Sequence, residues 1–295
     1  MAHESKWVRW TAHTFLMAFS IACIIPFVLL IMSSISSEES IIQFGYSFWP
    51  EQFSLMAYEY LWNHRGELGR AYGITAFITV IGTAASLAMT TMLAYPMSRQ
   101  DIPMRNFWAF FVFFTLLFNG GLVPTYLIYT QVFEIKNTIW ALIVPGLLMN
   151  GFYVLLVRTF FITSVPPALM EAAYIDGAGE IKTFYKIVIP LSMPILATIG
   201  LFEAILYWND WFNGMTYVTD PKLFSIQNIL NRIITDIQFL SNNSNLSSAA
   251  SNEMAELPST SVRMAIAVVG LLPILIAYPF FQKYFIKGIT IGALK

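Results

Sequence analysis

Long apolar stretches without charges alternate with short charged segments along this chain. A helix of about 20 apolar residues crosses a hydrocarbon core of roughly 30 Å. Backbone groups in lipid must be satisfied within the segment, so each stretch predicts a helix. Six spans are expected, at residues 15–35, within 71–98, within 106–133, and at 138–157, 189–211 and 264–282. The first has too long an apolar core for a signal peptide and no small-x-small cleavage site after it, which predicts a retained anchor.

The composition agrees with this pattern. The 295 residues are 57% hydrophobic and 11% charged, and the mean hydropathy is +0.64. These values predict an all-α integral membrane protein with a single transmembrane domain over residues 1–295. The net charge of −1 gives no sign of nucleic-acid binding, and the one cysteine, Cys23, forms no intramolecular disulfide.

Lysines and arginines set the expected orientation. With the N-terminus in the cytoplasm, ten of them fall on inner segments and six on the longer outer segments. The positive-inside rule then predicts cytoplasmic N- and C-termini and a cytoplasmic loop at 162–190. Residues 36–70 and 213–262 become outer loops.

Prolines and glycines interrupt several spans. They include Pro26, Gly120-Gly121 with Pro124, Pro145, Pro190 with Pro194, and Pro273 with Pro279. Each removes or weakens a backbone hydrogen bond, which predicts kinked helices around a cavity. Close packing of helices at small residues is the alternative for each site.

The run EAAYIDGAGEIKTFYKIVIPL, residues 171–191, is a polar segment between two spans. Pro167 suits the first turn of a helix that continues to Ile175, and Gly177 can end it with a positive φ. A second helix is expected over residues 178–188, stopped by Pro190. The residues alone leave open whether this is a simple interfacial connection or a docking site for another protein.

The same run resembles the EAA loop of permease subunits in binding-protein-dependent ABC importers, whose pattern is EAA, three residues, G, nine residues, I, one residue, LP. The positions that match it are Glu171, Ala172, Ala173, Gly177, Ile187 and Pro190. Ile189 stands where the family usually has leucine. The runs AYPMSR (94–99), NTIWALIVPG (137–146) and WNDWFN (208–213) resemble the carbohydrate branch of that family, and FNGGLVPTYL (118–127) and the ending KYFIKGITIGALK resemble permeases of alginate and other complex-oligosaccharide importers.

This resemblance implies a type I ABC importer permease in a bacterial inner membrane. It implies a second homologous permease, two ATPase subunits, an extracytoplasmic sugar-binding protein and an oligosaccharide substrate, with an acidic alginate- or pectin-type sugar suggested by the subgroup. The EAA loop would form the coupling helix, with contacts from Glu171, Ala172, Ala173, Asp176 and Gly177. The chain has no GxxxxGK[ST] phosphate loop, so ATP and Mg would bind at the partner ATPase subunits and this chain would bear no catalytic residue.

One face of the fifth span carries Gly200, Glu203, Tyr207, Asp210 and Gly214 at helical spacing. A polar aromatic cluster follows toward its outer end, made of Tyr207, Trp208, Asn209, Asp210, Trp211 and Asn213. Aromatic rings stack on sugar faces while amides and carboxylates bond hydroxyls, so this cluster and Glu203 are candidates for the substrate path. An aromatic belt at the lipid interface, and a hydrogen bond between subunits for Glu203, are the alternatives.

The polar run from Ser241 to Glu253 in the second outer loop cannot pack by itself. In maltose-type importers the corresponding loop reaches into the binding protein, so the resemblance suggests contacts from Asn242, Asn243, Asn245 and Asn252.

Two other functions remain open from the residues. An ion-coupled secondary transporter would use Glu203 and Asp210 as ion sites. An intramembrane enzyme is disfavoured, because His3, His13 and His64 lie outside the spans or at the start of the first, and no metal or nucleophile motif accompanies Glu203.

Overall fold

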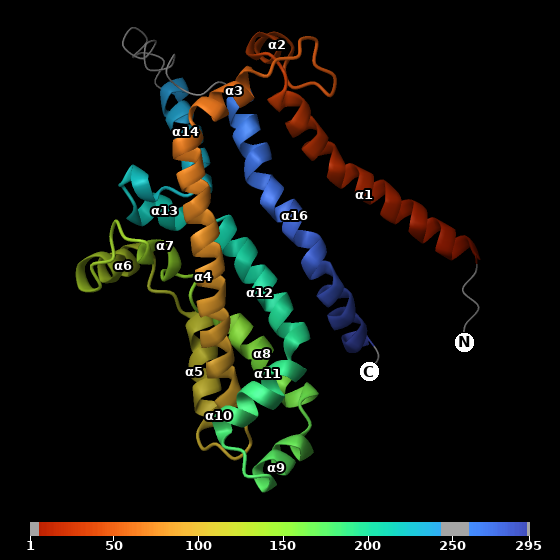
Figure 1. Ribbon diagram of the computed structural model, residues 1–295, viewed down its shortest axis with the longest axis vertical. Coiled ribbons are helices and arrows are strands. Elements are labelled where there is room, and N and C mark those ends of the chain that lie inside the picture. The colour runs from red at the N-terminus through yellow and green to blue at the C-terminus, as the bar shows by residue number, and fades with distance from the viewer. Residues whose placement is uncertain (1–5, 243–259, 294–295) are drawn as a thin grey trace. The chain divides into compact units, whose positions relative to one another are not determined.

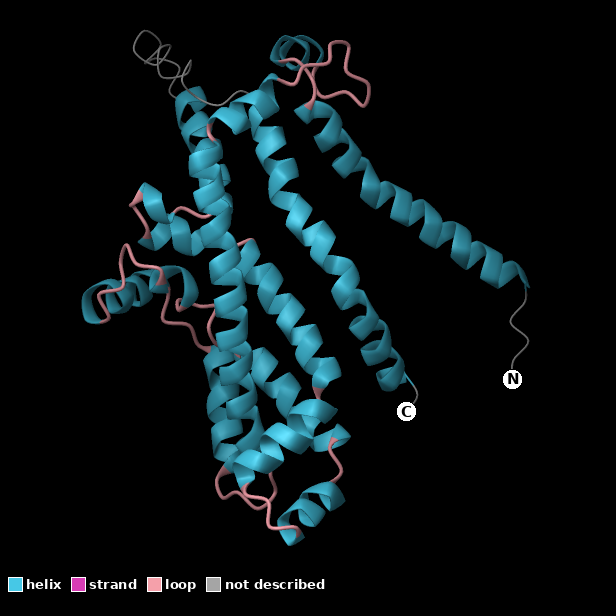
Figure 2. Ribbon diagram, viewed as in Figure 1, coloured by secondary structure: helices cyan, strands magenta, loops and turns pink. Residues whose placement is uncertain are grey.

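The computed structural model describes residues 6–242 and 260–293, and Figure 1 shows that helices joined by loops make up this part of the chain. Within it the extended structure is one isolated bridge between Ser36 and Phe53, so the predicted all-α class is confirmed (Figure 2). The chain divides into two compact units, Met1–Leu68 with Leu230–Pro273 and Gly69–Ile229 with Ile274–Lys295.

The first unit begins with α1 (Lys6–Ser34), which agrees with the first predicted span. None of its most apolar window is buried. A helix that is apolar all round belongs in lipid or against another chain. Pro26 lies inside α1 without ending it. Two short helices follow, α2 (Glu38–Phe44) and α3 (Met56–Asn63).

A carboxylate from α2 caps the start of α16 (Thr260–Ala293) within this unit. The two Glu38 oxygens accept hydrogen bonds from the backbone N–H groups of Thr260 (2.9 Å) and Ser261 (3.0 Å), and Oε2 also accepts one from the Ser261 hydroxyl (3.2 Å). The first N–H groups of a helix have no intrahelical partner, so an acceptor at this end is stabilising. Partial burial raises the pKa of Glu38, but these hydrogen bonds outweigh it and hold the pKa below its usual value.

The long helix α4 (Arg65–Ser98) runs through most of the second unit and continues past Pro96. Its buried positions recur every three or four residues, which defines one packed face: Ala71, Thr75, Ile78, Gly82, Ser86, Thr90, Ala94 and Met97. Small residues on this face let neighbouring helices approach closely.

The third predicted span is broken. It consists of α5 (Arg105–Leu117) followed by α6 (Leu122–Leu127) and η1 (Ile128–Val132), with a bend of 112° between the two parts. Gly121 adopts a φ of +88° at the break, and its N–H donates to Asn119 Oδ1 at 2.8 Å. The expected kink at Gly120-Gly121 is therefore confirmed.

The bounds expected for the fourth span are wrong. Only residues Trp140–Ile143 of the first half are helical (α7), and the main helix is α8 (Gly151–Ser164). Pro145 and Gly146, which has a φ of +71°, break the chain between them. Asn150 then caps α8, accepting from the Phe152 N–H at 2.9 Å.

The fifth span is α12 (Met193–Trp208), followed by α13 (Phe212–Tyr217), η3 (Pro221–Leu223) and α14 (Ile226–Asn242). Two described helices are long and apolar enough to cross a membrane by themselves, and there are up to five candidate spans when each bent pair counts as one. The shorter apolar helix Thr260–Ile276 lies where the sixth span is expected. One apolar core joins the Arg99 end of α4 to α5, α8 and α12, with buried members such as Met97, Val112, Val157 and Ile199.

Candidate functional site

The segment with the EAA motif folds as a helix, a turn and a second helix. The first helix, α9 (Pro167–Ile175), begins with its proline in the first turn, as predicted. Gly177 has a φ of +73°, and the Ala178 N–H donates to the Ala173 carbonyl at 2.9 Å. This is the bond that closes a helix with a left-handed glycine. Such a turn favours glycine, because a side chain at a positive φ is strained.

The second helix does not stop at Pro190, and that expectation is wrong. The chain stays helical through α10 (Glu180–Thr183), η2 (Phe184–Val188) and α11 (Ile189–Leu191), and only at Ser192 does it bend by 80° into α12. Pro190 falls in the first turn of α11, where its missing N–H is tolerated. The segment η2 before it is π-helical, since the Ile189 N–H donates to the Phe184 carbonyl five residues earlier. The helix reaches Pro190 through this wider turn.

The residues expected to contact the ATPase differ in exposure. Glu171, Ala172, Asp176 and Gly177 are exposed, whereas Ala173 is buried and Ile187 is half-buried. Pro190 is exposed. Two large apolar side chains at the end of α9, Tyr174 and Ile175, are 80% and 83% exposed. α9 therefore presents a mixed polar and apolar surface that the second unit leaves uncovered.

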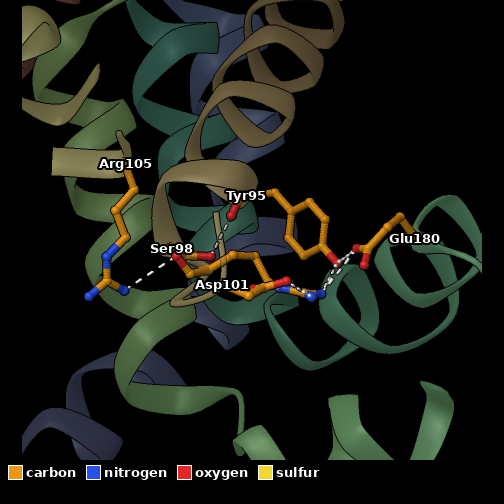
Figure 3. A network of polar contacts seen from close by, with 6 residues as sticks. Tyr95, Ser98, Asp101, Arg105 and Glu180 are labelled. Atoms are coloured by element: carbon orange, nitrogen blue, oxygen red, sulfur yellow. Dashed lines mark hydrogen bonds and ion pairs between the residues drawn. The ribbon is translucent and has the colours of Figure 1, made fainter. Parts of the chain in front are cut away.

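A polar network ties α10 to the end of α4 (Figure 3). The Arg99 guanidinium donates two hydrogen bonds of 2.7 Å to the Asp101 carboxylate and one of 3.0 Å to Glu180 Oε2. The Tyr95 hydroxyl donates to the same Glu180 oxygen at 2.8 Å. The hydrogen bonds to Arg99 lower the pKa of Asp101, and the same bonds raise that of Arg99. Sequence reasoning missed this network, because Arg99 and Glu180 lie 81 positions apart.

The predicted substrate-path residues on α12 are largely buried. Glu203 and Tyr207 are fully buried and Trp208 is 9% exposed. The Tyr207 hydroxyl donates to the Ile143 carbonyl at 2.9 Å, where α7 ends before the break at Pro145. The ring also lies against Gly82 of α4, where an added Cβ would stand 2.5 Å from it.

Glu203 lies on α12 between two close contacts with α4. Gly200 faces Leu87 and Tyr207 faces Gly82, so Glu203 lies at the level of Ser86. The Ser86 hydroxyl lies next to the carboxylate without reaching hydrogen-bond geometry, so neither carboxylate oxygen has a partner among the described residues. The carboxyl group is therefore enclosed within this unit rather than exposed on a surface of it.

The WNDWFN run folds around the broken segment between α7 and α8. Asn213 is buried and its side-chain amide donates to the Pro145 carbonyl at 2.9 Å. Asp210 Oδ1 accepts from the Asn213 N–H at 3.2 Å. Asn209 and Trp211 are exposed. Of the predicted cluster, these two present the most accessible surface in this conformation.

The predicted binding-protein contacts lie at or beyond the end of α14. Asn243, Asn245 and Asn252 lie outside the described residues. Asn242 is the last residue of α14.

Helices around an EAA loop of this geometry define a class of protein, the membrane-spanning permease subunits of ABC importers. Residues 104–291 match the family described as the binding-protein-dependent transport system inner membrane component. The chain therefore belongs to this family. In the family the ATPase is a separate subunit, so this chain is a permease and not itself the ATPase, as predicted. Its partners in general terms are a second permease, an ATPase and a substrate-binding protein.

Relatives match along nearly the whole chain. It is 35% identical over 287 residues to the polygalacturonan/rhamnogalacturonan transport system permease protein YtcP of Bacillus subtilis (strain 168), covering 95% of this chain and 96% of that protein. It is 36% identical over 272 residues to protein LplC of the same organism, covering 92% and 89%. The predicted resemblance to carbohydrate-importer permeases is confirmed.

A solved structure shows the same fold. It is the crystal structure of a bacterial ABC transporter involved in the import of the acidic polysaccharide alginate, and one of its chains aligns with a TM-score of 0.79 at 29% identity. The alignment covers 97% of this chain and 99% of that chain. The predicted type I permease fold and multi-pass membrane location are therefore confirmed.

Proposed function

We propose that this permease imports acidic oligosaccharides of the uronate type, which it receives from an extracytoplasmic binding protein. The proposal is carried by whole-length similarity to a permease named for polygalacturonan and rhamnogalacturonan and to a chain of an alginate importer. All three of these named polymers carry carboxylate groups. Family membership also favours ATP-driven import over the alternative of an ion-coupled carrier using Glu203 and Asp210.

The proposed assembly contains a second homologous permease and two ATPase subunits, which bind ATP and Mg. The charge asymmetry of the sequence supports cytoplasmic termini and a cytoplasmic EAA loop. Glu171, Ala172, Asp176 and Gly177 are exposed on that loop. Together with the exposed Tyr174 and Ile175 they form the surface that would enter a cleft of the ATPase.

The substrate path would run past the outer end of α12. Asn209 and Trp211 are its exposed members and offer an amide and an aromatic face. The buried Tyr207 and Asn213 instead hold the backbone of the adjacent break through Ile143 and Pro145. The Asn-rich stretch that includes Asn243, Asn245 and Asn252 is proposed to reach the binding protein.

Uptake by the reconstituted complex tests the cargo. Proteoliposomes that hold the permeases and ATPases are supplied with binding protein and radiolabelled trigalacturonate, or with maltotriose as the neutral control of equal length. ATP-dependent accumulation of trigalacturonate in excess of maltotriose is expected. Equal accumulation of both sugars, or accumulation of maltotriose alone, would reject the acidic class.

A further inference from the structure

The side-chain network of Arg99, Tyr95 and Glu180 joins the EAA segment to the helical bundle. A role for it rests on the proposed function of the loop as the ATPase docking site. Glu180 is the first residue of α10, the helix that directly follows the turn at Gly177. It accepts hydrogen bonds from Tyr95 at 2.8 Å and from Arg99 at 3.0 Å. Figure 3 shows the Tyr95 hydroxyl directed at the Glu180 carboxylate.

A ring contact adds to the polar contacts. Phe184 lies one helical turn after Glu180, and its ring centroid is 5.0 Å from that of Tyr95. Phe184 is itself buried in the apolar core. Tyr95 is thus held at two successive turns of the second helix, by the carboxylate at Glu180 and by the ring at Phe184.

The end of α4 that bears Arg99 is fixed to two further helices. The Arg158 guanidinium of α8 donates to the Met97 carbonyl at 3.0 Å, and Arg105 of α5 donates to the Arg99 carbonyl at 3.3 Å. Cationic donors at the last carbonyls of a helix satisfy groups that have no intrahelical partner. The contacts of Glu180 and Phe184 with Tyr95 therefore lie next to the place where α4 is fixed to α5 and α8.

Along the chain, the docking surface comes directly before one turn and the network directly after it. α9 carries the exposed EAA residues, and only Asp176 to Gly179 separate it from Glu180. The Ala178 N–H is bonded to the Ala173 carbonyl, so this turn is ordered rather than slack. Glu180 is the first residue after this turn, and its side chain contacts Tyr95 of α4 and the adjacent Arg99.

We propose that Arg99 is a positioning residue for coupling, which holds Glu180 so that movement of the docked EAA loop is transmitted to α4 and the helices around it. Arg99 suits this role because its planar guanidinium engages Asp101 with two nitrogens and still reaches Glu180 with the third. Asp101 in turn fixes the orientation of the guanidinium.

The test uses the complete complex in proteoliposomes with binding protein and trigalacturonate, and measures molecules imported per ATP hydrolysed. Arg99→Gln is expected to lower this ratio by roughly three- to tenfold. Tyr95→Phe should lower it less. Asp101→Asn weakens the contact that orients the guanidinium and should also lower the ratio, but by less than Arg99→Gln does. Arg70→Gln is the matched control, since it removes an exposed arginine at the other end of α4, and it should stay within about twofold of wild type.

The charge exchange Arg99→Glu with Glu180→Arg separates a pairing role from a folding role, provided that it is made together with Asp101→Asn so that the new carboxylate does not face Asp101. The exchange is expected to recover import per ATP relative to Arg99→Glu or Glu180→Arg made in the same Asp101→Asn background. An unchanged ratio in Arg99→Gln, or no recovery in the exchange, would overturn the role of Arg99. A wild-type complex without ATPase stimulation by loaded binding protein would instead contradict the proposed function.

Discussion

The hydroxyl of Tyr207 donates a hydrogen bond of 2.9 Å to the carbonyl of Ile143, 64 positions earlier in the chain. Ile143 is the last residue of α7, and the break at Pro145 and Gly146 follows it. The tyrosine therefore satisfies a carbonyl near a point where the helix ends. Tyr207 was predicted to line the sugar path. In this conformation its hydroxyl instead stabilises the backbone at the break in the fourth span.

Tyr207→Phe is expected to destabilise the purified complex, because it leaves a buried carbonyl without its donor at a cost of about 1–3 kcal/mol. The thermal midpoint of the detergent-solubilised complex should fall. Tyr153→Phe is the control, since Tyr153 is half-buried and makes no hydrogen bond among the described residues. Equal midpoints for Tyr207→Phe and wild type would show that this bond adds nothing.

Gly82→Ala is expected to lower the thermal midpoint of the complex, although it adds only one methyl group. The added Cβ would stand 2.5 Å from the Tyr207 ring, which is itself fully buried. Overpacking of this kind costs about 1–3 kcal/mol. Gly73→Ala, on the same helix with nothing within 4 Å of the added carbon, should leave the midpoint unchanged or raise it. Equal thermal midpoints for the two variants would show that Gly82 of α4 is not in close contact with Tyr207 of α12.

Glu38→Gln is expected to lower stability by about 1 kcal/mol at neutral pH, because it removes the charged acceptor at the start of α16. The pKa of Glu38 is lowered in the folded state, so its contribution is present above the unfolded-state pKa of about 4.3 and is lost as pH falls through the folded value. The difference between wild type and variant should shrink when the thermal midpoint is measured at lower pH.

Glu39→Gln provides the control for that series. Glu39 is the exposed neighbour of Glu38 in the first turn of α2. Its variant should follow the wild-type pH dependence. If the difference in thermal midpoint between wild type and Glu38→Gln does not change with pH, the charge of Glu38 does not stabilise the start of α16.

Glu203→Leu is expected to maintain or raise the thermal midpoint, because the carboxylate oxygens are buried without partners among the described residues. Replacing such a polar group with an apolar one of similar size removes its desolvation cost. Uptake by the same variant then tests the substrate path. Normal uptake would remove Glu203 from that path, and a lowered midpoint would show that the carboxyl group is stabilised by the neighbouring Ser86 hydroxyl.

The EAA segment was predictable because its signals are local. A proline in the first turn and a glycine at a positive φ mark the bounds of α9, whichever neighbours surround it. The fourth span was misplaced because hydropathy does not separate an apolar helix from an apolar loop. Residues 144–150 are almost free of polar side chains, yet Pro145 and Gly146 prevent a continuous helix there.

Contacts between distant segments could not be predicted. The pairing of Arg99 with Glu180 depends on how α10 packs against α4, and the bond from Tyr207 to Ile143 depends on how α12 packs against the break that Pro145 marks. Pro190 was expected to end a helix on propensity alone. The π-helical turn before Pro190 allows the helix to continue. That turn is defined by its hydrogen-bond pattern, which amino-acid composition does not predict.

The most direct test of coupling through the EAA loop is the Gly177→Asn variant. Asparagine tolerates a left-handed conformation, and nothing lies within 4 Å of the added Cβ, so the turn should survive while a side chain is added to the docking surface. ATPase stimulation by loaded binding protein, measured in proteoliposomes, should fall by about tenfold or more. Gly179→Ala, with a φ of −71° and open space around it, should retain stimulation. Full stimulation in Gly177→Asn would contradict the account.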